Sequence, residues 1–342
     1  MWFVWRQQRS IVIAFALLAV VVSVWALIMG LHEQSLWREY LSAPCKGEAG
    51  GFTTSDLKLC EHVQFSLYSS GKLNEVVIGF GMTFAPLFGL ILGVNAVAHE
   101  IEQKTNRLAW TQSGSRTRWL MNKYLMSIAP LVVILVPLCW LLSWWVGATH
   151  VAPRIMPKVF AMSGFIEVAC GIFCFALAVV VGLIVRRPGW SLAAAAVLFA
   201  AIFLGFYSSG VLLNLGSPSV AVFRGNGVEV GSSSGFIAAG GAPANSWPIS
   251  QGFVPKMAEG IPSTSVLNRS ASRVYRCEDA IPEGNLAHRD TYCLKHLGLI
   301  DVQWYIPNSQ YWALQSFEGG FYLIAAALLA AFSLFAVRRV KA

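Results

Sequence analysis

Six stretches of the sequence are long and apolar enough to cross a lipid bilayer. They lie at about 11–30, 76–98, 125–148, 159–185, 190–213 and 319–337. A helix rises about 1.5 Å per residue, so roughly 20 apolar residues span the hydrocarbon. Backbone polar groups inside lipid must be paired within such a segment. The sequence therefore predicts an all-α polytopic membrane protein with six transmembrane helices.

The composition agrees with lipid as the solvent. Hydrophobic residues make up 56% of the chain and charged residues 12%, against about 25% charged residues in soluble domains. The net charge of +8 lies in short clusters beside the apolar stretches. This placement is typical of membrane topology signals and argues against nucleic acid as a partner. The first stretch is longer than the core of a signal peptide, so we expect it to be retained.

Lysine and arginine predict which helix ends face the cytoplasm. With the N-terminus inside, the inner segments are 1–10, about 99–124, 186–187 and 338–342. These short segments hold 12 of the 25 lysines and arginines, and the rest are spread over much longer outer segments. Short loops rich in positive charge face the cytoplasm. We therefore expect a multi-pass protein of the plasma membrane with both termini cytoplasmic.

The spans and loops predict five consecutive regions. They are the N-terminus with span one (1–30), an outer segment (31–74), spans two to five with an inner loop at 99–124 (75–213), a large outer segment (214–318), and span six with a basic tail (319–342). A structureless loop as long as the second outer segment is unusual. We expect short strands and turns there.

Four cysteines fall in the predicted outer segments, where an oxidising environment favours disulfides. Cys45 and Cys60 lie in the first segment, and Cys277 and Cys293 lie in the second. The local pairs are the favoured pairing, but four cysteines allow three connectivities, and four free thiols are the alternative.

The inner loop at 99–124 is too polar to span the membrane and too apolar to be a plain linker. Leu108, Trp110 and Trp119 need burial. A short amphipathic helix at the membrane surface or in the groove of a partner would bury them, and Thr105 is a suitable cap.

Three sets of residues carry a family resemblance. The inner loop contributes Glu100, Thr105, residues 107–113 (Arg-Leu-Ala-Trp-Thr-Gln-Ser), Ser115, Arg116 and Lys123. The approach to the last span contributes Tyr305, Pro307, Ser309, Tyr311, Trp312, Gln315 and Glu318, and that span closes on Arg338 and Arg339. The third set is Arg186–Arg187. With these residues the sequence resembles the permeases of type-two ATP-binding-cassette exporters, particularly the actinobacterial branch.

The resemblance implies a bacterial exporter in which two permease subunits, identical or paralogous, work with cytoplasmic ATPase subunits. It implies that the inner loop forms a coupling helix that docks on the ATPase. The residues expected in this contact are Glu100, Glu102, Lys104, Thr105, Arg107, Leu108, Trp110 and Arg116. The family commonly has Gly at the position of Lys104. A helix that only anchors topology and touches anionic lipid is the alternative.

The same resemblance implies outward transport of a small amphipathic compound, antibiotic, peptide or lipid. The sequence contains no G-x-x-x-x-G-K-[ST] phosphate loop and no metalloprotease spacing. We therefore expect no catalytic residue, metal or cofactor in this chain itself, with ATP and Mg²⁺ bound by the partner ATPase.

Polar and aromatic residues near the spans are candidates for the substrate pathway or a gate. Glu167 falls about one-third of the way into predicted span four, where a carboxylate is costly and faces protein or a water-filled cavity. A structural carboxylate is the alternative. The other candidates are Asn95, Trp144, Gln315 and Glu318.

The G-x-x-x-G pair of Gly89 and Gly93 in span two permits close helix contact, and we expect this contact within the chain.

Two other functions fit parts of the sequence. A membrane receptor or sensor would use the large outer segment to bind a ligand. A membrane enzyme would use Glu167 with His150, His288 and His296, but these residues lack a convergent acid–base spacing.

Overall fold

The computed structural model describes residues 2–42, 54–102, 115–149, 154–208, 215, 219–222, 246–255, 264–279 and 289–339. They form two compact units. The helical unit holds α1 (Trp2–Ser42), α2 (Thr54–Glu102), α4 (Arg116–Thr149), α5 (Pro157–Phe160), α6 (Ile166–Val185), α7 (Pro188–Ser208) and α11 (Tyr311–Arg339). The sheet unit holds β1 (Ser219–Val222), β2 (Trp247–Pro255), α9 (Thr264–Asp279), α10 (Arg289–Leu297) and β3 (Leu299–Ile306).

Within the described chain, six helices have the length and composition needed to cross a membrane. They are Trp5–Glu39, Leu73–Glu102, Arg116–Thr149, Ile166–Val185, Pro188–Ser208 and Asn308–Arg339. Large apolar side chains such as Trp140, Leu204 and Leu328 are exposed on these helices. Such a surface suits lipid as its solvent. The all-α polytopic fold and the number of spans are therefore confirmed.

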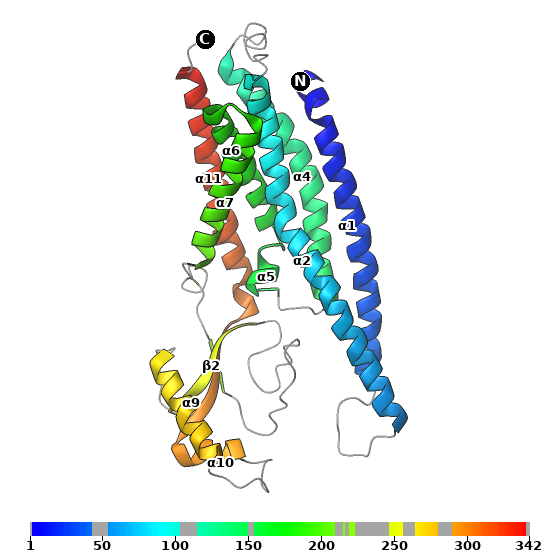
Figure 1. Ribbon diagram of the computed structural model, residues 1–342, viewed down its shortest axis with the longest axis vertical. Helices are drawn as coiled ribbons and strands as arrows, with labels where there is room; N and C mark the ends of the chain where they lie inside the picture. The colour runs from blue at the N-terminus through cyan, green and yellow to red at the C-terminus, as the bar shows by residue number, and fades with distance from the viewer. Residues whose placement is uncertain are drawn as a thin grey trace. The chain divides into compact units, whose positions relative to one another are not determined.

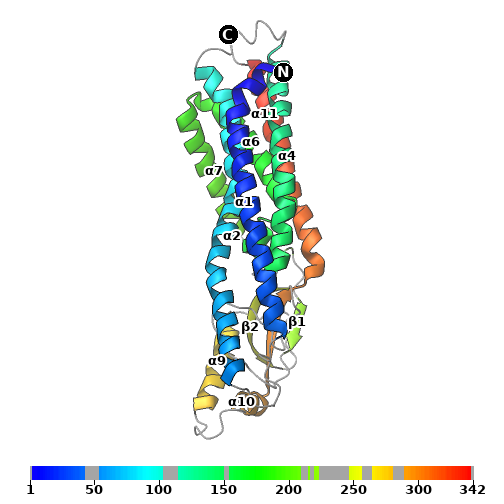
Figure 2. The ribbon, with the colours of Figure 1, turned by 90° about the vertical axis from the view of Figure 1, so that its right-hand side faces the viewer.

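Helix α6 lies at the centre of the helical unit, with α2, α4 and α7 packed against it (Figures 1 and 2). The contact with α2 depends on glycine. A Cβ atom on Gly89 would lie 2.2 Å from the carbonyl oxygen of Gly171, and one on Gly93 would lie 2.5 Å from that of Phe175. No side chain fits at either distance. The prediction that the G-x-x-x-G pair makes a contact within the chain is confirmed.

Helices α1 and α2 extend well beyond the predicted apolar stretches. Helix α1 continues to Ser42 and α2 begins at Thr54, so much of the segment 31–74 is helical. Two hydrogen bonds hold the extensions. Asn74 Nδ2 donates to Glu33 Oε1 at 2.6 Å, and Trp37 Nε1 donates to the Thr149 carbonyl at 3.2 Å. The hydropathy pattern marks only the apolar part of each helix.

Span four begins later than expected. The sequence predicts its start near residue 159, whereas α6 begins at Ile166 after the separate short helix α5. Gly164 breaks the chain between them with φ of +71°. Gln315 Nε2 donates to the carbonyls of Phe160 and Ser163 at 3.2 and 3.0 Å. Because this side chain from α11 pairs carbonyls that a helix would have paired, the break is stable.

The sheet unit contains a three-stranded antiparallel sheet in the order β1-β3-β2. Val254, Val302 and Trp304 form its small core. Helix α9 packs on β2 and α10 packs on β3. The Cys277–Cys293 disulfide, with an S–S distance of 2.01 Å, joins the two helices. That predicted pair and the expected strands are confirmed, although the sequence analysis missed the two helices. The Cys45–Cys60 pair lies outside the described side chains.

The N-terminal end of α1 and the C-terminal end of α11 lie at the same end of the helical unit (Figures 1 and 2). Arg338 Nε near the end of α11 donates to Thr117 Oγ1 at the start of α4 at 3.4 Å. The described chain thus agrees with an even number of spans, which places both ends on one side of a membrane.

Candidate functional site

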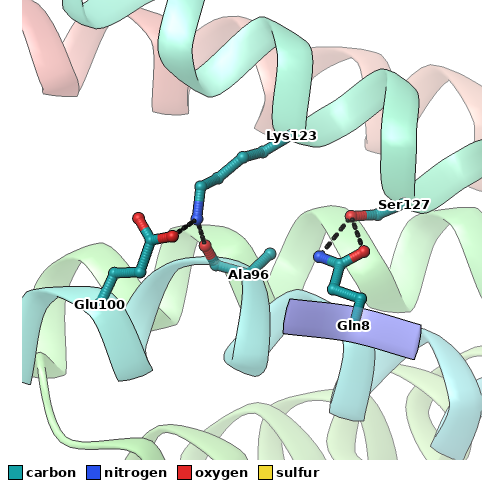
Figure 3. A network of polar contacts seen from close by, with 5 residues as sticks. All are labelled: Gln8, Ala96, Glu100, Lys123 and Ser127. Atoms are coloured by element: carbon teal, nitrogen blue, oxygen red, sulfur yellow. Dashed lines mark hydrogen bonds and ion pairs between the residues drawn. The ribbon is translucent and has the colours of Figure 1, made fainter. Parts of the chain in front are cut away.

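A buried ion pair links the two helices that flank the inner loop (Figure 3). Lys123 Nζ on α4 lies 2.6 Å from Glu100 Oε1 on α2, and the two side chains are 1% and 3% exposed. Lys123 also donates to the carbonyl oxygen of Ala96, one helical turn before Glu100. The ring of Trp119 lies 4.9 Å from the same ammonium group.

These contacts fix the end of α2 to the start of α4. Burial of an ion without a partner costs roughly several kcal/mol of folding free energy, so each of the two charges requires the other. The carbonyl of Ala96 and the face of Trp119 supply further favourable contacts to the ammonium group. The two ends of the inner loop are therefore held as one rigid element.

A second polar contact ties α1 to the same region. Gln8 Nε2 donates to Ser127 Oγ at 2.8 Å, and Ser127 Oγ donates to Gln8 Oε1 at 3.0 Å (Figure 3). Both side chains are buried. Ser127 lies one turn after Lys123 on α4, so α1, α2 and α4 meet at the end of the unit that bears the inner loop.

The structure places only part of the predicted coupling segment. Glu100 is buried in the ion pair, Glu102 is exposed at the end of α2, and Arg116 is the first residue of α4. Ser115 Oγ accepts from the Arg118 backbone N–H at 3.2 Å and caps α4. The remaining candidates lie outside the described residues: Lys104, Thr105, Arg107, Leu108 and Trp110. Trp119 is buried, as the sequence predicts.

A second polar site lies among α2, α6, α7 and α11. Glu167 from α6 and Glu318 from α11 line one small cavity, together with Cys170 and Tyr322. The α7 residue Phe203 lines it as well. Two of the candidate pathway residues, which lie far apart in the sequence, are thus brought together.

A side-chain donor contacts each carboxylate. Cys139 Sγ donates to Glu167 Oε2 at 3.6 Å, and the Tyr207 hydroxyl donates to Glu318 Oε1 at 3.4 Å. Glu167 lies in the first turn of α6, so the interpretation that it lies one-third of the way into a span is wrong. A carboxylate at this end of a helix is stabilised by the helix dipole.

The other pathway candidates lie elsewhere in the helical unit. Gln315 is fully buried at the break before α6, where it serves the backbone. Trp144 packs on α1, since a Cβ atom on Gly30 would lie 3.0 Å from its ring. Asn95 is half-buried on α2. None of these three lines the cavity described above.

Sequence reasoning missed three partners that the structure supplies. Lys123 belongs to the family resemblance but is not among the predicted site residues. Its signal is its position beside a predicted span, because a lysine there usually has a buried partner. Tyr207 and Cys139 carry no such signal, because a hydroxyl or thiol in an apolar helix is common.

The described residues contain no group of three or more His, Cys, Asp or Glu suited to a metal ion. Cys139, Cys170 and Cys174 are buried free thiols.

A comparison with protein families gives one match. The family described as ABC-2 membrane transporter related matches residues 12–208, which is more than half of the chain. No curated protein and no solved structure matches the chain. The matched residues include α2, α4, α6 and α7, and with them the Glu100–Lys123 ion pair and Glu167.

Proposed function

Because this chain belongs to the ABC-2 membrane transporter related family, we propose that it is the permease subunit of an ATP-driven exporter whose ATPase is a separate chain. The observation that carries this proposal is the match across residues 12–208, which covers four of the six candidate spans completely, most of the first span, and the segment between α2 and α4. A transmembrane transport component of this family generally works with an ATP-binding subunit.

We propose that residues 103–114, between the two helices fixed by the ion pair, dock on that ATPase. Movement of the ATPase would then push on α2 and α4 together, because Glu100 and Lys123 hold the two helix ends as one element. Exposed Glu102 and the basic residues Lys104, Arg107 and Arg116 offer charge for the contact. In this proposal Glu100 positions the docking segment from inside the unit and does not touch the partner.

The proposed orientation places both termini and the docking segment in the cytoplasm. The Cys277–Cys293 disulfide supports this, because disulfides persist in oxidising compartments. A second permease copy, identical or paralogous, would complete the pathway for a small amphipathic compound, antibiotic, peptide or lipid moving outward.

The test is reconstitution of the chain in lipid with an ATP-binding-cassette ATPase encoded beside it. We expect ATP hydrolysis only with both proteins present, and a tenfold or greater loss of its coupling to transport for Arg107→Glu. Arg187→Glu is the matched control, because Arg187 is exposed on a different proposed inner segment. Hydrolysis by the isolated chain, or equal effects of the two substitutions, would contradict the proposal.

A further inference from the structure

The cavity among α2, α6, α7 and α11 contains two buried carboxylates. The exposed fraction is 2% for Glu167 and 0% for Glu318. Within the described chain, Oε1 of Glu167 and Oε2 of Glu318 have no hydrogen-bond donor, while the other oxygen of each accepts from a side chain at 3.6 and 3.4 Å. The backbone of Ala85 is a further hydrogen-bonding neighbour of Glu167. Buried polar atoms are almost always paired. Each carboxylate therefore has one oxygen atom that can accept a hydrogen bond from a bound group.

A positive group would suit the lining of this cavity. Its lining includes two carboxylates and no lysine, arginine or histidine among the described residues. Two unpaired carboxylates within membrane helices are costly, and such groups mark ion or substrate sites. In contrast, the buried Glu100 has Lys123, and the buried Glu33 has Asn74. A cation would supply the partner that Glu167 and Glu318 lack.

The rest of the lining indicates which kind of cation fits. Aromatic rings of Phe199, Phe203 and Tyr322 and the apolar side chains of Met82 and Ile166 surround the carboxylates. Aromatic faces attract an ammonium group, and apolar side chains favour its hydrocarbon substituents. A hydrated metal ion would find neither enough oxygen ligands nor a polar wall here.

From these observations we infer that the cavity binds the ammonium group of a lipophilic amine between Glu167 and Glu318. The cavity holds about 20 Å³ of free volume, which is enough for one group the size of a water molecule. An ammonium group has that size, and its tail would lie outside the described volume. The inference rests on the proposed function and names its substrate class: amphipathic amines that carry positive charge.

The experiment measures equilibrium binding of radiolabelled octylamine to the purified full chain in lipid nanodiscs, with empty nanodiscs as the blank for partition into lipid. In the unaltered protein we expect saturable binding that unlabelled octylamine displaces and the uncharged octanol does not. Equal displacement by octanol would overturn the inference, because charge would then play no part. This comparison requires no variant.

Variants then locate the site. Glu167→Gln and Glu318→Gln should each weaken octylamine binding at least tenfold, which corresponds to about 1.4 kcal/mol. Glu33→Gln is the matched control, since Glu33 is an equally buried carboxylate outside the cavity, and it should leave binding unchanged. Unchanged binding in both cavity variants would overturn the inference, as would equal loss in all three.

A carboxylate pair that binds only protons is the competing explanation. It predicts no saturable octylamine binding. It also predicts that the carboxylic acid C=O band in infrared spectra of the protein diminishes in Glu167→Gln or Glu318→Gln. That result would also overturn the inference. Binding is measured without an ATPase, so a failure of the proposed function, seen as no partner-dependent ATP hydrolysis, is recorded separately.

Discussion

Lys123 and Glu100 show what a single pair of charges contributes inside a membrane protein. Their side chains are almost completely buried, and the ammonium group also donates to the Ala96 carbonyl. The attraction between buried charges is offset largely by the loss of their hydration. We therefore expect the pair to add less to stability than to specificity, by selecting one register of α2 against α4.

Removal of one charge tests this view. Glu100→Gln or Lys123→Met leaves the other ion buried without a partner, and we expect the free energy of unfolding to fall by about 3–5 kcal/mol. The measurement is an SDS titration of the purified protein in mixed micelles. Glu102→Gln, at the exposed end of the same helix, should change it by about 0.5 kcal/mol or less.

The double variant Glu100→Gln with Lys123→Met should recover much of that loss, because neither charge then remains unpaired. It should nevertheless lower ATP-driven transport in the reconstituted complex, since the register of α2 against α4 is no longer fixed. Additive losses of stability in the double variant would show that the two side chains act independently.

At the scale of helices, the contact of α2 with α6 depends on the absence of side chains. Gly89→Ala places a methyl group 2.2 Å from the Gly171 carbonyl oxygen, so the helices must move apart. We expect a loss of about 1–3 kcal/mol in the free energy of unfolding, measured by the same SDS titration.

Gly79 provides the control for this substitution on the same helix. A Cβ atom there meets no atom within 4 Å. Gly79→Ala should be neutral or stabilise the protein slightly, because alanine favours helix over glycine by about 1 kcal/mol. If both substitutions destabilise equally, backbone effects outweigh the contact between α2 and α6.

The helices also show how far the sequence predicts the fold. Apolar length alone predicts the six spans correctly, because lipid selects for it directly. It does not predict the late start of α6, since the break at Gly164 is held by Gln315 from a distant helix. The extension of α1 depends similarly on Asn74. Unlike the G-x-x-x-G pair, these two contacts between helices carry no local signature in the sequence.

The candidate site is likewise only partly predictable from the sequence. Glu167 stands out in the sequence because a carboxylate beside an apolar stretch is costly. Glu318 stands out through the family resemblance. That both line one cavity depends on the packing of α11 beside α6, seen in the contact of Phe173 with Tyr322 at 5.5 Å between ring centroids. No spacing in the sequence predicts this meeting.

At the scale of the whole molecule, the even number of spans and the disulfide support the same membrane topology. Six spans return the chain to the side on which it began. The Cys277–Cys293 disulfide favours the outer side for the sheet unit. In the proposed topology the docking segment between α2 and α4 faces the cytoplasm, where ATP is available.

Cysteine labelling in intact cells tests this topology. Tyr275→Cys introduces a thiol at an exposed position of α9, and Glu102→Cys introduces one at the exposed end of α2. A membrane-impermeant maleimide should label position 275 in intact cells and position 102 only after permeabilisation, as judged by mass spectrometry of the modified peptides. Both positions are exposed on the protein surface, so a difference in labelling reports the side of the membrane. Labelling of position 102 from outside would put the docking segment beyond the reach of any cytoplasmic ATPase, and the proposed coupling would fail with it.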